Sequence, residues 1–407
     1  MIGATTSGEL RAHNRVRLLR AVHDCGATRT RSQLTRDLHL ARGTASVLVA
    51  GLAEHELLHE EPAREHGRGR PTQVPGPHPR GPLALAVDVR EDAWELAACE
   101  LGGRTTVLGL QPHDGTPEGT LGPLGDAIAA HRRRLGHRVV GVGVALAGPV
   151  RHGGLVDIAH LGWRSVDVPR LLGTKAPIVG NDTAFAALAE ARRGRLQGVR
   201  VGLHLHVDFD LGGVLVVEGR PLGGASGTGA EFGHMPLTGG DRPCPCGATG
   251  CWSMDVGANA LLRHVGLAYG GGRGRAQAEE VLAGSEEAVA ANARALGRGI
   301  AALVNAHDPE AVTLSGHGVE LYGRAGQALM ESCVPGLMAI RRDHPPRIEG
   351  SALGWRGALL GAMESVFDAF LTPEGLERWR ENHPDQGRDT PERSNVTHST
   401  LKGAKPL

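Results

Sequence analysis

The 407-residue sequence predicts a small, mostly helical N-terminal domain followed by a larger α/β domain. Residues 11–61 hold three stretches with apolar residues at helical spacing, separated by short breaks. From about residue 82 to 373, short apolar strand patterns alternate with Ala-rich helical patterns, which is typical of sheets flanked by helices. Prolines at positions 75, 77, 79 and 82 separate the two parts. We therefore predict one domain at residues 1–75 and a second at residues 82–371.

Composition narrows the class of protein. Hydrophobic residues make up 41% and charged residues 22%, as in ordinary globular domains. The sequence has no apolar run long enough to span a bilayer, and its N-terminus does not resemble a signal peptide. We therefore expect a cytoplasmic protein that does not bind membranes. Three of the six cysteines fall within residues 244–251, which favours metal binding over disulfides in a reducing compartment.

The N-terminal domain is predicted from helical periodicity and its interruptions. Gly26 is a plausible end for the first helix, and Thr30 is placed to cap the second. In the third helix we expect Val47, Leu48 and Leu52 to share the buried face. The expected elements, in order, are helices at residues 11–25, 31–38 and 42–55, a strand at 57–61 and a basic, glycine-containing loop at 67–72.

Three short helices followed by a strand and a basic loop are the parts of a winged helix-turn-helix, whose third helix enters the DNA major groove. Residues 1–53 carry eight arginines against three acids, which also favours nucleic acid. The arginines of the basic loop can insert into the DNA minor groove, whose negative potential attracts them. A helical interaction domain with an Arg-rich linker is the alternative. The residues expected to reach DNA are Arg31, Arg42, Thr44, Ala45, Ser46, Arg68 and Arg70.

The second domain is predicted from short apolar strands and longer helical stretches. Its expected strands lie at residues 83–89, 138–147, 177–179, 201–207, 214–218 and 311–314, with helices beginning at 183 and spanning 285–307. Residues 372–407 are polar and charged, and we expect this tail to be disordered.

A compact group of one histidine and three cysteines is the most specific local signal. His234, Cys244, Cys246 and Cys251 supply a complete tetrahedral ligand set for zinc. Glycines at 247 and 250 let the chain turn tightly between the cysteines. A closed set of four ligands leaves no position for water, so this Zn²⁺ is expected to be structural. Three buried thiols and a core histidine are the alternative.

These motifs together resemble the ROK family, which contains sugar-responsive transcription regulators and sugar kinases. The resemblance runs from about residue 10 to about residue 371, and the zinc stretch is its most specific part. The fused winged helix is similar to the regulator branch. The stretches that carry the resemblance are 11–15, 34–40, 52–57, 69–71, 148–150, 161–163, 181–182, 231–251, 308–310 and 315–316.

The resemblance implies a two-lobed actin-like fold, of the type shared by sugar kinases and Hsp70-type ATPases, with a sugar in the cleft. Carried over by position, Asn181, Asp182, Glu231 and His234 would contact sugar hydroxyls. Asp182 stands where kinases of the family keep the base that takes a proton from the sugar. For Asn181 and Asp182, a helix cap ahead of Thr183 is the alternative interpretation.

The sequence departs from the family where kinases hold phosphates. Residues 88–92 lack the glycine, threonine and lysine of the first phosphate turn, and residues 207–213 lack the alternating glycines of the second. The turns instead carry Glu91, Asp92, Asp208 and Asp210, whose negative charge would repel phosphate. Because phosphoryl transfer depends on positioning and electrostatics, we expect no kinase activity and no catalytic residues, with Asp182 a vestige of the base.

The sugar site also departs from the family. Ser253 replaces a glutamate that usually contacts sugar, and Asp255 is the nearest acid that could substitute for it. His160 stands where many members have asparagine, and Ala147 replaces a usual proline. The effector can therefore be a different sugar, a sugar phosphate or another metabolite.

The sequence thus predicts a sequence-specific, DNA-binding transcription regulator that responds to a sugar or related metabolite. Its expected partners are a double-stranded operator, a small-molecule effector and further copies of the chain, as a homodimer or homotetramer. One alternative is a ROK kinase that phosphorylates a hexose with ATP. Another is a ligand-independent DNA-binding regulator whose effector domain is vestigial.

Overall fold

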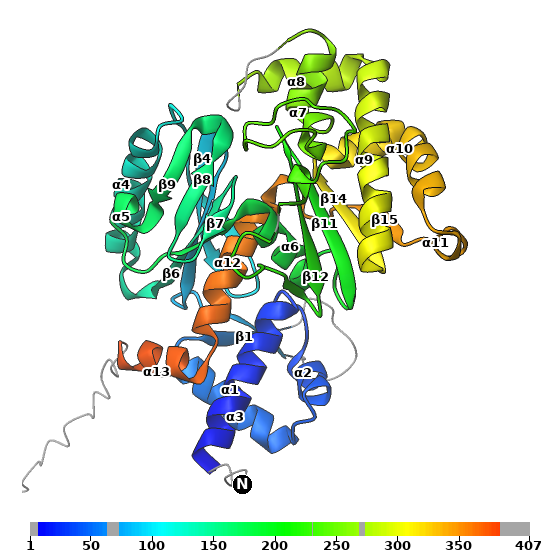
Figure 1. The fold of residues 1–407 in the computed structure, drawn as a ribbon. Helices are drawn as coiled ribbons and strands as arrows, with labels where there is room; N and C mark the ends of the chain where they lie inside the picture. Colours follow the sequence, from blue (N-terminus) through cyan, green and yellow to red (C-terminus); the bar gives the residue numbers. More distant parts are fainter. Residues whose placement is uncertain (1–6, 63–72, 230, 268–272, 383–407) are drawn as a thin grey trace, which may run out of the picture.

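A computed structural model describes residues 7–62, 73–229, 231–267 and 273–382. Two lobes lie side by side, and the N-terminal helices lie beneath them at one end of the molecule (Figure 1). The predicted fold class, a winged helix-turn-helix followed by an α/β actin-like domain, is confirmed. None of the described helices is long and apolar enough to cross a lipid bilayer.

The N-terminal domain is built from three helices and an antiparallel hairpin. Thr30 caps α2 by accepting from the Gln33 amide at 3.2 Å, as its position predicted. Pro75 and Pro77 lie inside β2, so the proline-rich stretch forms part of this domain as well as its boundary. The elements are α1 (Ser7–Asp24), α2 (Arg31–Asp37), α3 (Arg42–Glu54), β1 (Leu58–Pro62) and β2 (Gln73–Pro77).

The buried face of α3 differs from the predicted one. Val47 is 72% exposed, so its assignment to the core is wrong. Ala45 is 1% exposed and packs inside, so the expectation that it reaches DNA is wrong as well. The reason is helical geometry, because residues 45, 48, 49 and 52 follow one 3.6-residue stripe and position 47 falls on the opposite face.

The two lobes repeat one sheet topology. In each, three consecutive strands form an antiparallel meander, and two later strands add in parallel beside its first strand. The first lobe holds β3 (Leu83–Val89), β4 (Ala93–Glu100), β5 (Thr105–Pro112), β6 (Val139–Leu146) and β10 (Ile178–Asn181). The second lobe holds β11 (Val201–Val207), β12 (Leu211–Val217), β13 (Arg220–Pro221), β14 (Ala311–Gly316) and β15 (Arg347–Gly350).

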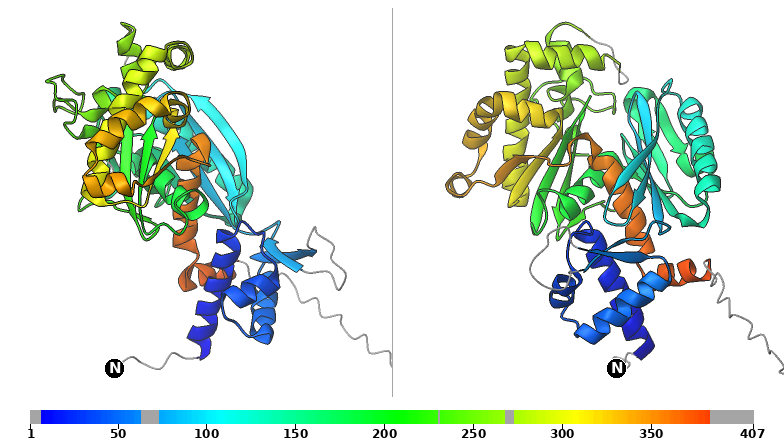
Figure 2. Two further views of the ribbon diagram at one scale, coloured as in Figure 1. Left: turned by 90° about the vertical axis from the view of Figure 1, so that its right-hand side faces the viewer. Right: turned by 180° about the vertical axis from the view of Figure 1, so that it is seen from behind.

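Helices cover the sheets and fill the space between the lobes. Helices α6 and α12 pack against each other between the two sheets (Figures 1 and 2). A small third sheet consists of β7 (Val150–Arg151), β8 (Leu155–Ile158) and β9 (Trp163–Asp167). The helices of the lobes are α4 (Pro117–Leu135), α5 (Val168–Leu172), α6 (Asp182–Arg193), α7 (Ala258–His264), α8 (Arg275–Gly284), α9 (Glu286–His307), α10 (His317–Gly336), α11 (Ala339–Asp343), α12 (Gly357–Phe370) and α13 (Pro373–Glu381).

The N-terminal domain is joined to the lobes by one continuous apolar core. Leu18, Leu19 and Val22 of α1 are fully buried in the same cluster as Phe367 of α12. Burying such side chains contributes about 1.5–3 kcal/mol each. The two domains therefore share a core, and a change in their arrangement would expose apolar surface.

A buried polar group at this junction fixes the contact further. The His23 Nε2 atom lies 3.1 Å from Glu364 Oε2, and Arg193 donates to the other oxygen of Glu364. The Gly102 amide donates to His23 Nδ1 at 3.0 Å, which places the imidazole proton on Nε2. Burial alone would raise the pKa of Glu364, but His23 and Arg193 outweigh it and lower that pKa. The junction therefore holds an ionised carboxylate.

The expected disorder from residue 372 is wrong for the segment that forms α13. Trp379 is 3% exposed, and its indole N–H donates to the His55 carbonyl of the N-terminal domain at 2.8 Å. Trp379 and Leu376 give this short polar segment enough apolar surface to dock. The rest of the predicted tail, residues 383–407, lies outside the described residues.

We predict that Glu364→Gln lowers the free energy of unfolding by about 3 kcal/mol, because it leaves the partly buried Arg193 guanidinium without its buried carboxylate. Urea unfolding followed by circular dichroism measures this loss. The matched control is Asp37→Asn, which breaks an exposed ion pair with Arg29 and should cost no more than about 1 kcal/mol. Equal losses in the two variants would contradict the role of the junction.

Candidate effector cleft and zinc centre

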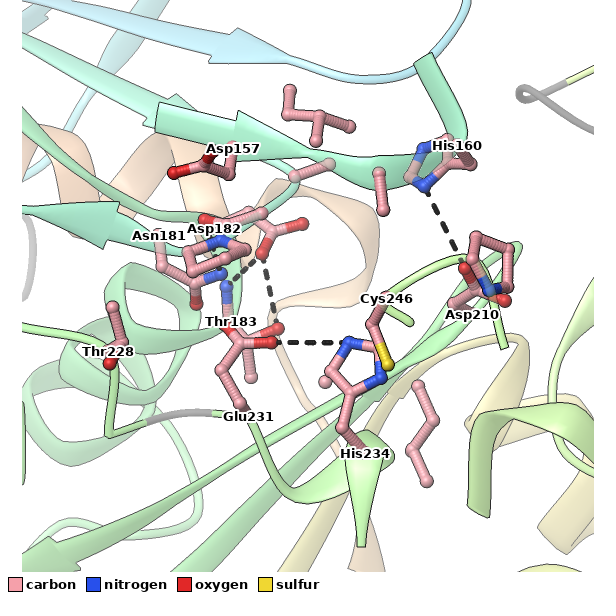
Figure 3. A pocket seen from close by; sticks show the side chains of 18 of the residues that line it. Asp157, His160, Asn181, Asp182, Thr183, Asp210, Thr228, Glu231, His234 and Cys246 are labelled. Carbon is pink, nitrogen blue, oxygen red and sulfur yellow. Dashed lines mark hydrogen bonds and ion pairs between the residues drawn. The ribbon is translucent and has the colours of Figure 1, made fainter. Parts of the chain in front are cut away.

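The principal cavity lies between the lobes and encloses about 410 Å³. That volume lies in the range of about 300–1,000 Å³ typical of small-molecule sites. Asn181 and Asp182 enter the cavity from the start of α6, and His160 from the first lobe; Glu231 and His234 enter from the segment after β13 (Figure 3). All four residues that the family resemblance assigns to sugar binding thus line one cavity.

The start of α6 combines capping with exposure to the cavity. The Asn181 Oδ1 atom accepts from the Ala184 amide at 2.9 Å, and its Nδ2 donates to the Gly148 carbonyl at 3.1 Å. Asn181 is therefore the helix cap, as the alternative interpretation held, and it retains one N–H for a ligand. Asp182 accepts from the Thr183 amide at 2.6 Å.

Asp182 and Glu231 are partly buried in the cavity. Burial raises the pKa of Asp182, and burial together with Asp182 raises the pKa of Glu231 to about 7. Such carboxylates favour a ligand that offers hydroxyl donors, because the donors replace hydration that the cavity withholds. The same carboxylates disfavour an anionic ligand at this position.

The predicted zinc ligands are brought together. His234 Nδ1 lies 3.7 Å from Cys244 Sγ, and Cys246 Sγ lies 3.7 Å from Cys251 Sγ. All four ligand atoms lie within 4.8 Å of one another. A tetrahedral zinc with bonds of about 2.3 Å has ligands about 3.7 Å apart, so the group fits the ion. Cys246 is exposed, which a cluster of core thiols would not explain.

His234 connects the segment that carries the zinc ligands, residues 234–255, to the cleft; we call this segment the zinc loop. Its Nδ1 faces the cysteine sulfurs, and its Nε2 lies 3.6 Å from Glu231 Oε2 (Figure 3). Zinc at Nδ1 would leave the proton on Nε2, so the ring would present a donor beside Glu231. The zinc loop therefore forms one wall of the cavity and orients one of its polar groups.

The turn between β3 and β4 and the turn between β11 and β12 lie on different lobes and are joined by Arg275. Its Nη1 and Nη2 donate to the two oxygens of Asp208 at 2.9 and 3.2 Å, and its Nε donates to Asp92 at 3.1 Å. The guanidinium also stacks 4.8 Å above the ring of Phe209. Burial alone would raise the pKa of Asp208, but Arg275 outweighs it and lowers that pKa. An internal cation is thus clamped between carboxylates at these turns.

The other departures from the family have structural counterparts. His160 lies 3.6 Å from Glu91 and 3.8 Å from Asp210, so it spans the two lobes (Figure 3). Ser253 is buried and donates to the Gly233 carbonyl at 2.8 Å. Asp255 does not line the cleft but pairs with Arg242, so the idea that it replaces the missing acid is wrong.

The predicted DNA contacts divide into three groups. Arg42, Thr44 and Ser46 are exposed on α3, while Arg31 at the start of α2 forms an ion pair with Glu60 at 3.0 Å. Arg68 and Arg70 lie outside the described residues. Val47, which the sequence pattern assigned to the core, is exposed beside these polar groups. The helical register of α3 places Val47 off the buried stripe. An exposed apolar side chain on such a helix can contact thymine methyl groups.

Comparisons with known proteins agree with this architecture. The model of the ROK family matches residues 88–368, and the chain belongs to this family. A solved ROK family transcriptional regulator, described as a homologue of the Escherichia coli MLC protein, shares the fold with a TM-score of 0.70 at 20% identity, over 91% of this chain and 99% of that one.

Curated relatives include both regulators and kinases. The xylose repressor of Bacillus subtilis is 23% identical over 84% of this chain and 92% of its own length. A glucokinase of Streptomyces coelicolor is 28% identical over 45% of this chain, a match that spans 59% of the glucokinase.

We predict about one zinc per chain in freshly purified, folded protein, as measured by inductively coupled plasma mass spectrometry. Cys251→Ser should lower that stoichiometry and the melting temperature, because it removes a buried ligand. Cys25→Ser, which changes a half-buried cysteine away from the cluster, should retain the metal. Metal content near zero in folded wild-type protein would contradict the ligand assignment.

Proposed function

We propose that this ROK family member is a sequence-specific DNA-binding transcription regulator that responds to a sugar or related metabolite and has no kinase activity. The observation that carries the proposal is the exposed helix α3 of the N-terminal domain, fused to a kinase-like fold. In that fold, Arg275 pairs with carboxylates at the turns where kinases of the family would bind phosphate. The likeness to transcription regulators over most of the chain supports it. The acidic cavity supports a neutral polyol as effector.

The proposed DNA surface is the exposed face of α3. Arg42 can grip guanine, Thr44 and Ser46 can bond bases or phosphates, and Val47 can pack on a thymine methyl. Arg68 and Arg70 are proposed to bind in the DNA minor groove. Two copies of the chain would address a palindromic operator, with the lobes supplying the contact between copies.

Helix α6 offers a direct route from the cavity to the DNA-binding domain. Its first turn carries Asn181 and Asp182 in the cavity, and its last residue, Arg193, contacts α1. The Arg193 Nη1 atom donates to the His23 carbonyl at 3.3 Å, and Arg193 also holds Glu364. A ligand that moved the first turn of α6 would therefore bias the position of α1, which is the coupling that regulation requires.

A sugar kinase is the second candidate, favoured by Asp182 at the position of the base inside the cavity. Arg275 and the carboxylates around it weigh against this function, because phosphates would have to displace a fully paired guanidinium. A third candidate is a ligand-independent regulator. It is favoured by Ser253, whose hydroxyl is engaged with Gly233 instead of the cavity.

The direct test is capture of sheared genomic DNA from the source organism on the purified protein, repeated with a mixture of sugars and sugar phosphates. We expect enrichment of a few palindromic sites, and a change in their occupancy with the mixture. Sites that ignore every compound would favour the ligand-independent regulator. No enrichment, together with ATP-dependent hexose phosphorylation that Asp182→Asn abolishes, would establish the kinase instead.

We predict that Arg42→Ala weakens binding to a captured site by about 1–3 kcal/mol, because it removes a contact to a base. Fluorescence anisotropy at several salt concentrations measures the loss. The matched control is Arg220→Ala, an exposed arginine of the second lobe, which should bind as the wild type does. Equal binding by the Arg42 variant would remove this residue from the interface.

A further inference from the structure

A second cavity, of about 360 Å³, lies beside the zinc loop and shares no lining residue with the cleft. Its walls come from the zinc loop, α7 and α9. Four arginines and one histidine line it, against a single carboxylate, so the formal charge of its lining is +3 with the histidine neutral (4 − 1). The basic side chains are Arg242, Arg263, His264, Arg294 and Arg298, and the acid is Asp255.

Arg263 lies deepest in this basic group and is incompletely satisfied. Its Nη2 donates to the Met254 carbonyl at 2.6 Å, while its Nε is buried without a hydrogen-bond partner. Burial, followed by the nearby charge of Arg242, lowers the pKa of Arg263. A guanidinium in this setting is stabilised by any anion that enters the cavity, because the anion supplies both counter-charge and acceptors.

Arg294 and Arg298 add positive charge from one turn of α9. They are exposed, four residues apart, and form no ion pair with another described residue. Like charges at this spacing destabilise a helix. Asp255 does not compensate for them, since it pairs with Arg242 at 3.3 Å. Three guanidinium groups thus surround the cavity without a carboxylate of their own.

We propose that this cavity is a second ligand site, which binds a small phosphorylated metabolite of about the size of a hexose monophosphate. Guanidinium forks match phosphate oxygens in bidentate fashion, and Arg263, Arg294 and Arg298 supply three. The volume falls in the range of about 300–1,000 Å³ found for small-molecule sites. A DNA phosphate is a poor occupant, because α7 and the beginning of α9 lie at the end of the molecule away from α3 (Figures 1 and 2).

The site adjoins the zinc loop. Arg242 lies two residues before the ligand Cys244, and its Nη1 donates to the Met254 carbonyl at 3.1 Å. A phosphate among these arginines would therefore act on the same loop that forms a wall of the cleft. This proposal concerns binding at a separate cavity, so it stands whether or not the chain is a regulator.

Isothermal titration calorimetry on the full-length, zinc-containing protein tests the site, with glucose 6-phosphate, inorganic phosphate and glucose as probes. We expect one glucose 6-phosphate per chain at this cavity, and at least tenfold weaker binding by Arg294→Gln/Arg298→Gln. Both arginines are exposed, so the variant should retain its zinc and its melting temperature. Arg220→Gln, which removes a positive charge elsewhere on the second lobe, should bind like the wild type.

Three results would overturn the proposal. Wild-type protein that binds neither phosphate-bearing probe would show that the cavity does not take phosphate. An equal loss in Arg220→Gln would show only general attraction of anions. Binding that Asp182→Asn abolishes and the double variant leaves intact would place the phosphate ester in the cleft.

Discussion

The buried carboxylate of Glu364 constrains the rest of the molecule. A charge removed from water needs a counter-charge and hydrogen-bond donors in place, and here Arg193 supplies the charge while His23 supplies a further donor. His23 belongs to α1 of the N-terminal domain, Arg193 ends α6, and Glu364 lies in α12. One carboxylate therefore fixes three helices that meet between the domains. Because the surrounding core is continuous across them, a shift of the N-terminal domain would disturb its packing against the lobes.

The same helix, α6, begins at the cleft between the two lobes. Two lobes of repeated topology still place two hairpin turns opposite each other. Their carboxylates would repel one another if left alone, and Arg275 of α8 reduces this repulsion by pairing with Asp92 and Asp208. Arg275 thus links the two lobes by ion pairs at these turns. The zinc loop closes the adjacent side and presents His234 to the cavity.

Local patterns in the sequence predicted local structure well. The strands at 83–89 and 201–207 and the cap at Thr30 were predicted from apolar runs and capping residues. Contacts between distant residues could not be predicted in this way. His23 and Glu364 are 341 residues apart, and the pairing of Arg275 with Asp208 depends on how the lobes close. The error at Val47 arose from the register of one helix, and the docking of α13 depends on a groove that only the fold creates.

The central claim is that the cleft and the DNA-binding helix are coupled through α6. Coupling of this kind is reciprocal, so bound DNA must change the conformational stability of the cleft. Hydrogen–deuterium exchange by mass spectrometry, with and without a captured DNA site, measures this directly. The account predicts altered exchange in the first turn of α6, at residues 181–185, as well as in α3. Exchange that changes in the N-terminal domain alone would contradict it.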